Sequence, residues 1–199
     1  MGLLFTKPPT KSVLVVGLDG SGKSALLSCA RGIFRDDLTG SLPGVVRSEL
    51  IDPTAGMRLE IFTSGTAEWR CWDMSGRGTS RSMWPHFFSY VDAIVFVIDC
   101  TDIARAAVVR EELNRIVQQE EVQRKNVPFL FILNKIDIQK DEDEELVQKV
   151  RHWPGCGELP LLQAPPLPFT VVRLERCCSL PRLTFLFIHI IFVNDSHNS

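Results

Sequence analysis

A glycine-rich segment near the start of the chain has the residue types that bind phosphate. Residues 17–24, GLDGSGKS, match the pattern G-x-x-x-x-G-K-[ST] and lie between a short apolar run and a segment with helical spacing. Glycines let the backbone wrap closely around phosphate oxygens, and the N–H groups that open a helix attract anions. We expect Lys23 to neutralise the outer phosphates and the Ser24 hydroxyl to ligate Mg²⁺. The remaining predicted nucleotide contacts in this segment are Gly17, Asp19, Gly20, Ser21 and Gly22.

A second motif, NKID at residues 134–137, follows the apolar run PFLFIL. Open α/β sheets bind ligands at the carboxyl ends of their strands, so both motifs should lie on one edge of the sheet. The Asp137 carboxylate can accept hydrogen bonds from N1–H and from the exocyclic amine of guanine, whereas adenine offers no such donor pair. We therefore predict a guanine-nucleotide site that includes Asn134 and Asp137, with the stem of Lys135 packed over the base.

The elements that must position these motifs alternate between strands and helices, which predicts an α/β fold with a mostly parallel sheet. Continuous apolar runs predict buried parallel strands, and a turn at residues 64–66 predicts one antiparallel hairpin. The predicted strands are residues 12–18, 57–63, 69–73, 93–99, 128–133 and 169–172, and the predicted helices are residues 23–33, 104–119 and 142–150.

Length and composition fit one soluble domain that is not built for nucleic acid. The chain has 199 residues, 45% of them hydrophobic, and a formal charge of -2, which gives no electrostatic reason to bind a polyanion. Its six cysteines are scattered and lack the spacing of a zinc site, so we expect a reducing, cytoplasmic compartment. The longest apolar run, residues 183–193, falls short of the roughly 20 residues that span a bilayer.

Together with WDMSG at residues 72–76, these motifs resemble those of Arf/Arl-type small GTPases. The Trp before the Asp and the later MWPHFF, residues 83–88, are also similar to that family, and the wording DMSG resembles its ciliary branch, which recruits the BBSome coat. The resemblance extends over roughly residues 11–150. It implies a P-loop small-GTPase fold with helices on both faces of the sheet, and a switch that responds to GTP and GDP.

The resemblance also implies which residues sense the γ-phosphate. Asp73 would hold Mg²⁺ through water, and the Gly76 N–H would meet the γ-phosphate. Thr54, in the segment PTAGMRLE, matches the threonine that ligates Mg²⁺ when GTP is bound, whereas the earlier segment at residues 42–45 has no threonine. This alignment requires an insertion of about a dozen residues before Pro53, which a loop tolerates because closure entropy grows slowly with length.

The residue after Gly76 departs from the family pattern. The family places a glutamine there to orient the attacking water, whereas this chain has Arg77. Arginine has five N–H donors and no acceptor, so it cannot orient water as glutamine does. We interpret Arg77, at this catalytic position, as a loss of intrinsic hydrolysis rather than a built-in arginine finger.

Further family positions predict contacts with partners. Met57, Trp72 and Phe87 match an effector pocket, although core packing is an alternative, above all for Trp72. Pro85 removes a backbone donor and should shorten the helix of the second switch. The N-terminal MGLLFT fits a myristoylation pattern with Gly2 as acceptor, which would permit only marginal membrane binding.

We divide the chain into an N-terminal extension (residues 1–10), a small-GTPase domain (11–173) and an atypical tail (174–199) that lacks the family's final amphipathic helix. The leading prediction is a GTP-binding switch with weak hydrolysis. It would recruit effector or coat proteins, depend on an exchange factor and a GTPase activator, and act in the cytoplasm, at a membrane surface or at the cilium base. The alternatives are a non-hydrolysing scaffold and a P-loop kinase for a small metabolite.

Overall fold

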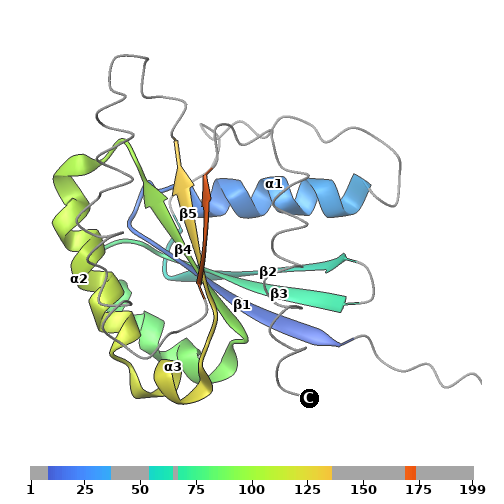
Figure 1. Ribbon diagram of the computed structural model, residues 1–199. Helices are drawn as coiled ribbons and strands as arrows, with labels where there is room; N and C mark the ends of the chain where they lie inside the picture. The colour runs from blue at the N-terminus through green and yellow to red at the C-terminus, as the bar shows by residue number, and fades with distance from the viewer. Residues whose placement is uncertain (1–8, 37–53, 65–66, 136–168, 174–199) are drawn as a thin grey trace, which may run out of the picture.

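The chain folds around a six-stranded sheet with strand order β2-β3-β1-β4-β5-β6 (Figure 1). The computed structural model describes residues 9–36, 54–64, 67–135 and 169–173. β2 pairs antiparallel with β3, and every other pair in the sheet is parallel, as predicted. The strands are β1 (Thr10–Val16), β2 (Met57–Ser64), β3 (Ala67–Met74), β4 (Ala93–Asp99), β5 (Phe129–Asn134) and β6 (Phe169–Arg173).

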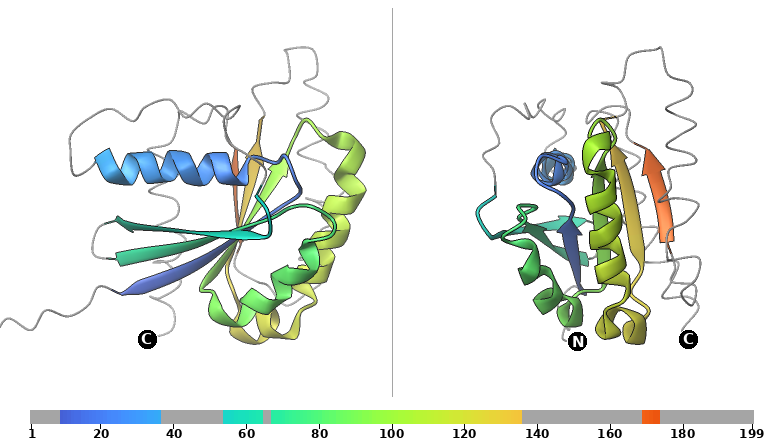
Figure 2. Two further views of the ribbon diagram at one scale, coloured as in Figure 1. Left: turned by 180° about the vertical axis from the view of Figure 1, so that it is seen from behind. Right: turned by 90° about the vertical axis from the view of Figure 1, so that its left-hand side faces the viewer.

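Helices cover both faces of this sheet, as the two views of Figure 2 show. They are α1 (Lys23–Asp36), η2 (Arg81–Tyr90), η3 (Ile103–Arg105), α2 (Ala106–Val117) and α3 (Glu120–Lys125), of which η2 and η3 are 3₁₀ helices. Side chains alternate across a strand, so β1 directs Val13 and Val15 to a core beneath α1, while Leu14 and Val16 enter the core beneath α2. The sheet therefore separates two apolar cores.

Two expectations about helices were wrong. Pro85 does not shorten the second switch helix, because η2 runs from Arg81 to Tyr90 with Pro85 inside it. Pro85 removes one backbone donor, but the buried side chains of Trp84 and Phe88 on either side of it anchor η2 to the core. The helix expected over residues 104–119 is shorter, since its first turn belongs to η3 and α2 ends at Val117.

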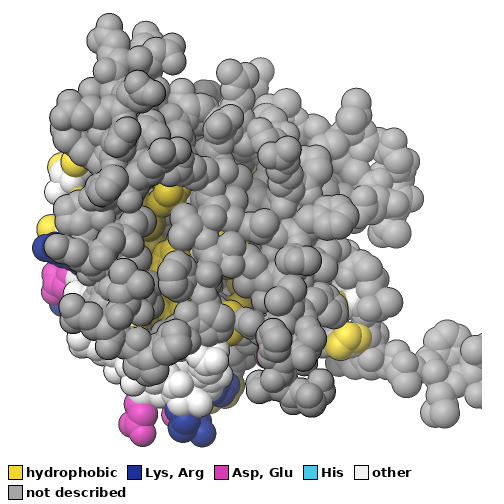
Figure 3. Space-filling model, viewed as in Figure 1, with side chains coloured by type: hydrophobic (Ala, Val, Ile, Leu, Met, Phe, Trp, Pro, Cys, Tyr) yellow, Lys and Arg dark blue, Asp and Glu magenta, His cyan; other side chains and the backbone are white. Residues whose placement is uncertain are grey.

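Charged side chains of both signs are visible at the left and lower edges of the described part of the molecule (Figure 3). Pairs three or four residues apart along α2 and α3, such as Arg115 with Glu111 and Arg124 with Glu121, form surface ion pairs. No helix among the described residues is long and apolar enough to cross a membrane. Gly2, Asp137, the segment at residues 42–45, the helix predicted at 142–150 and the tail at 174–199 lie outside the described residues.

Candidate nucleotide-binding site

The glycine-rich loop joins the end of β1 to the start of α1, as its motif predicted. Gly17 and Gly22 have backbone φ angles of 141° and 95°, which residues with a Cβ rarely adopt. A Cβ on Gly17 would lie 2.2 Å from the carbonyl oxygen of Val97 in β4. Only glycine fits there, and it lets the loop turn tightly over the end of the sheet.

Lys23 lies inside the curve of this loop. Its Nζ donates hydrogen bonds to the carbonyl oxygens of Gly17 at 3.0 Å and Leu18 at 2.8 Å. Burial lowers the pKa of Lys23 to about 8, although the nearby carboxylates of Asp73 and Asp19 act in the opposite direction. A buried ammonium group with two carbonyl partners is well placed to exchange them for phosphate oxygens.

Three oxygen-bearing side chains from distant segments converge beside Lys23, and they are the three predicted Mg²⁺ ligands. The hydroxyls of Ser24 and Thr54 are 3.0 Å apart, and Ser24 Oγ donates to Asp73 Oδ2 at 2.5 Å. Thr54 Oγ1 donates to the same carboxylate oxygen at 3.3 Å. Thr54 is therefore placed where the family resemblance put it, despite the long insertion that precedes it.

This donor set suits a hard divalent cation. Oxygen ligands about 2.1 Å from an octahedral Mg²⁺ lie about 3 Å apart, which is close to the separations between these side chains. Burial raises the pKa of Asp73, and hydrogen bonds from Ser24 and the charge of Lys23 only partly offset it. Among the described residues, Asp73 Oδ1 is buried without a hydrogen-bond partner. A cation bound here would compensate the buried carboxylate.

The loop after β3 packs directly on the phosphate-binding loop. A Cβ on Gly76 would lie 2.3 Å from the Asp19 nitrogen and from the Leu18 carbonyl carbon. Ser75 fixes the loop on its other side, because its N–H donates to the Gly56 carbonyl at 2.7 Å and its carbonyl accepts from Trp84 Nε1 at 3.1 Å. Gly76 is thus held against the loop that would contain the phosphates.

Arg77 follows Gly76 with its side chain exposed to solvent. Its backbone N–H lies 3.5 Å from Ser75 Oγ. The structure thus places Arg77 at the start of the segment that leads into η2, which is the position expected from the WDMSGR sequence.

The two described residues of the NKID motif connect three parts of the site. Asn134 Nδ2 donates to the Ser21 carbonyl at 2.8 Å, so the end of β5 is tied to the phosphate-binding loop. Lys135 adopts a left-handed conformation with φ 64°, and its Nζ donates to Asp99 Oδ2 at 2.6 Å. Asn134 and Lys135 therefore lie on the same sheet edge as the glycine-rich loop, as predicted.

Sequence reasoning missed the role of Asp99, which ends β4. Thr101 donates to Asp99 Oδ1 through its N–H at 2.9 Å and its hydroxyl at 2.6 Å, while Lys135 bonds to the other oxygen. Burial raises the pKa of Asp99, but these hydrogen bonds outweigh it and hold the pKa below its ordinary value. An acidic residue at the carboxyl end of a parallel strand was the available signal.

Two arginines on the surrounding elements were also missed. Arg105 donates to the Asp19 carboxylate at 2.9 Å and to its carbonyl at 3.0 Å. Arg81 approaches the same carboxylate at 3.6 Å. Asp19 therefore joins the phosphate-binding loop to η3 and η2, and nothing in its sequence spacing indicates these partners.

Two predicted effector residues, Met57 and Trp72, share one face of the β2–β3 hairpin, and the third, Phe87, lies in η2 and contacts Trp72. Leu59 is the cross-strand partner of Trp72, so alternation places the exposed Met57 on the same face as Trp72. The rings of Trp72 and Phe87 are 5.3 Å apart, and both side chains are partly buried against the core beneath α2. Trp72 and Phe87 are therefore packed against the core and are also partly exposed to solvent.

A sheet with this strand order and a phosphate-binding loop between its first strand and helix defines a P-loop nucleotide-binding protein with the small-GTPase fold. The sequence profile of the ADP-ribosylation factor family matches residues 3–155. The chain belongs to that family of GTP-binding switches.

Individual relatives agree with this assignment. The chain is 32% identical over 137 residues to ADP-ribosylation factor-like protein 6 of Danio rerio, covering 69% of this chain and 68% of the relative. It is 33% identical to ADP-ribosylation factor K of Dictyostelium discoideum, covering 68% of this chain and 64% of that protein. The chain thus spans about two thirds of the length of these relatives.

The same fold occurs in the solved structure of the Arl6 BBS3 small GTPase from Trypanosoma brucei with the bound nucleotide analogue GppNp. The match has a TM-score of 0.70 and 24% sequence identity, and covers 96% of this chain and 99% of that one. This match shows that the two chains share a fold, and the sequence relatives are those consistent with the predicted Arf-like branch.

Proposed function

We propose that this protein is a Mg²⁺-dependent guanine-nucleotide switch that recruits effectors in its GTP-bound form. The observation that supports this most directly is the convergence of Ser24, Thr54 and Asp73, whose oxygens lie 2.5–3.3 Å apart although the residues come from three separate segments. Thr54 would ligate Mg²⁺ only beside a γ-phosphate, and it lies three residues before Met57, the exposed first residue of β2. Nucleotide state would thereby affect the face that carries Met57, Trp72 and Phe87.

Nucleotide binding can be tested on the purified protein. We expect GTP and GDP, and not ATP, to displace a bound fluorescent guanine nucleotide when Mg²⁺ is present. Thr54→Ala should still bind nucleotide, since Ser24 and Asp73 remain, but should no longer distinguish the two states by effector binding. Preference for ATP would instead favour the P-loop kinase, and a wild-type response from Thr54→Ala would contradict the assignment of the switch.

Weak intrinsic hydrolysis is part of this proposal. Arg77 occupies the position where the family has glutamine, and it offers no acceptor to orient water. A GTPase activator would then have to supply what the site lacks. The alternative is a non-hydrolysing scaffold that stays in one nucleotide state, and failure of any cell fraction to accelerate phosphate release would favour it.

We further propose a role in membrane or ciliary trafficking, from the cytoplasm or the cilium base. Two observations support this proposal. The chain is similar to ADP-ribosylation factor-like protein 6 of Danio rerio and of Caenorhabditis elegans, and it has the sequence DMSG at residues 73–76, where β3 ends. Myristoylation of Gly2 would add a reversible membrane contact. Coat proteins, an exchange factor and a GTPase activator are the expected partners.

A further inference from the structure

Arg81, at the start of η2, contacts three separate parts of the nucleotide site through one guanidinium group. Nε donates to the Gly76 carbonyl at 2.8 Å, and Nη1 donates to Glu112 Oε1 in α2 at 3.2 Å. Nη2 lies 3.6 Å from Asp19 Oδ1 in the phosphate-binding loop. The Arg81 side chain is only 13% exposed, so these contacts define its position.

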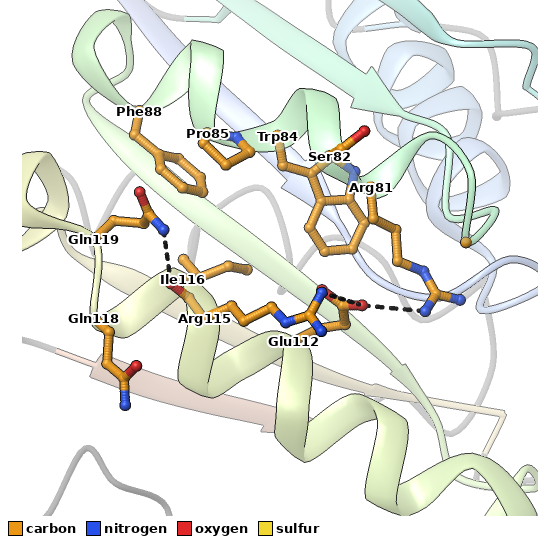
Figure 4. Close-up of a pocket in the computed structure, with 11 residues that line it drawn as sticks. Arg81, Ser82, Trp84, Pro85, Phe88, Glu112, Arg115, Ile116, Gln118 and Gln119 are labelled. Carbon is orange, nitrogen blue, oxygen red and sulfur yellow. Dashed lines mark hydrogen bonds and ion pairs between the residues drawn. The ribbon is translucent and has the colours of Figure 1, made fainter.

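Glu112 holds Arg81 from the opposite wall of a cavity of about 440 Å³ between η2 and α2. Figure 4 shows the two side chains pointing toward one another across this cavity, with Arg115 beside Glu112. Glu112 is 10% exposed on its side chain, whereas its neighbour Glu111 is 61% exposed. Neutralising Glu112 would leave the Arg81 charge buried without its acidic partner on α2, which is strongly unfavourable.

The position of Gly76 depends on this arginine. One side of Gly76 touches the phosphate-binding loop so closely that a Cβ would lie 2.5 Å from the Gly17 carbonyl oxygen. Its own carbonyl accepts the bond from Arg81. The bond from Arg81 orients the peptide that follows Gly76, and the bond from Trp84 Nε1 to the Ser75 carbonyl orients the peptide that carries the Gly76 N–H. Together with the loop contact, these two bonds hold both peptide groups of Gly76.

We infer that Arg81, held in place by Glu112, is a positioning residue that, together with the Trp84 bond to Ser75, holds Gly76 with its N–H available to the γ-phosphate, and that it thereby supports the preference for GTP over GDP. The inference rests on the proposed function, because it requires a γ-phosphate beside Gly76. Arg81 acts through Gly76 and is not itself a catalytic residue. GDP lacks the group that Gly76 would contact, so its affinity should depend much less on this arrangement.

The test compares Glu112→Gln with the matched control Glu111→Gln, one residue away on α2. Affinities for GTP and GDP are measured by fluorescent-nucleotide titration with Mg²⁺ present. We expect Glu112→Gln to reduce the ratio of GTP to GDP affinity about tenfold, equivalent to about 1.4 kcal/mol, and Glu111→Gln to leave it unchanged. An equal loss for both nucleotides would overturn the inference, because it would show that the ion pair only supports the fold.

Arg81→Lys provides a second test that keeps the positive charge. Lysine lacks the fork that joins Gly76 and Glu112 simultaneously, so the affinity ratio should fall in this variant as well. An unchanged ratio in a folded Arg81→Lys protein would also contradict the inference. Wild-type protein that binds neither GTP nor GDP would refute the proposed function itself, and the two failures are therefore distinguishable.

Discussion

At the scale of single residues, the candidate site combines side chains suited to phosphate and a cation with an unusual residue after Gly76. Lys23 bonds to the glycine-rich loop, and Ser24, Thr54 and Asp73 are hydrogen-bonded to one another. Arg77 is the exception, since its exposed side chain follows Gly76 where an acceptor would be needed. Binding and hydrolysis should therefore be separable in this protein.

Restoring the glutamine should separate them experimentally. We expect Arg77→Gln to hydrolyse GTP at least tenfold faster in a single turnover, which corresponds to about 1.4 kcal/mol of barrier, because glutamine can orient the attacking water. GTP affinity should change little. The measurement is phosphate release after Mg²⁺ is added to GTP-loaded protein, and a slower variant would show that Arg77 acts on the γ-phosphate in cis.

At the scale of elements, side-chain bonds add to the backbone pairing that joins the ends of β4 and β5. Asp99 and Asn134 are the last paired residues of β4 and β5, and Lys135 turns back to bond Asp99 immediately beyond that pair. Lys135 is the residue expected to pack over the base. The carboxylate of Asp99 should therefore fix the lysine stem that contacts the nucleotide.

Asp99→Asn should increase the rate of nucleotide dissociation by about five- to thirtyfold, as expected when a charge-assisted hydrogen bond worth roughly 1–2 kcal/mol is lost. The pKa of Asp99 lies below its ordinary value, so wild-type Asp99 remains charged and its dissociation rate should be similar at pH 6 and pH 8. Stopped-flow release of fluorescent GDP measures both.

Asp92→Asn is the matched control, because Asp92 lies just before the opposite end of β4 and accepts from the Ser12 N–H. It should dissociate nucleotide like the wild type. If Asp99→Asn also released GDP at the wild-type rate, Lys135 would have to be positioned by other contacts.

Much of this architecture could be predicted because its signals are local. Apolar runs identified the parallel strands, and the threonine chosen by its spacing to Asp73, Thr54, lies within hydrogen-bond distance of that carboxylate. The roles of Asp99 and Arg81 could not be predicted, since they arise where residues far apart in sequence meet. Pro85 misled the prediction because burial of Trp84 and Phe88 outweighs a missing backbone donor.

At the scale of the whole molecule, stability depends on two cores on opposite faces of one sheet. Phe96 is fully buried at the centre of β4, and its ring meets that of Trp84 edge-on at 6.4 Å. Since Trp84 also bonds to Ser75, this core supports the loop that contains Gly76. Loss of packing beneath α2 would therefore also disturb the loop that contains Gly76 in the nucleotide site.

Phe96→Ala should lower the free energy of unfolding by about 3–5 kcal/mol, because it leaves a cavity in a fully packed region. Ile61→Ala is the control, since Ile61 is exposed on β2 and its truncation should change stability by about 0.5 kcal/mol or less. Urea denaturation at saturating GDP gives both values. Equal midpoints for the two variants would show that the core relaxes around the missing ring.

The position of β2 at the end of the described sheet has a consequence for the protein in concentrated solution. Met57, Leu59 and Ile61 form an apolar row on this strand and are 39–51% exposed. An edge strand with such a row can pair with other chains, so we expect reversible self-association that grows with concentration. Ile61→Lys should weaken it, because a charge on an edge strand opposes pairing. Static light scattering over a concentration series would measure the self-association of the wild type and of Ile61→Lys. Identical curves for these two proteins would show that β2 is not the strand through which the chains associate.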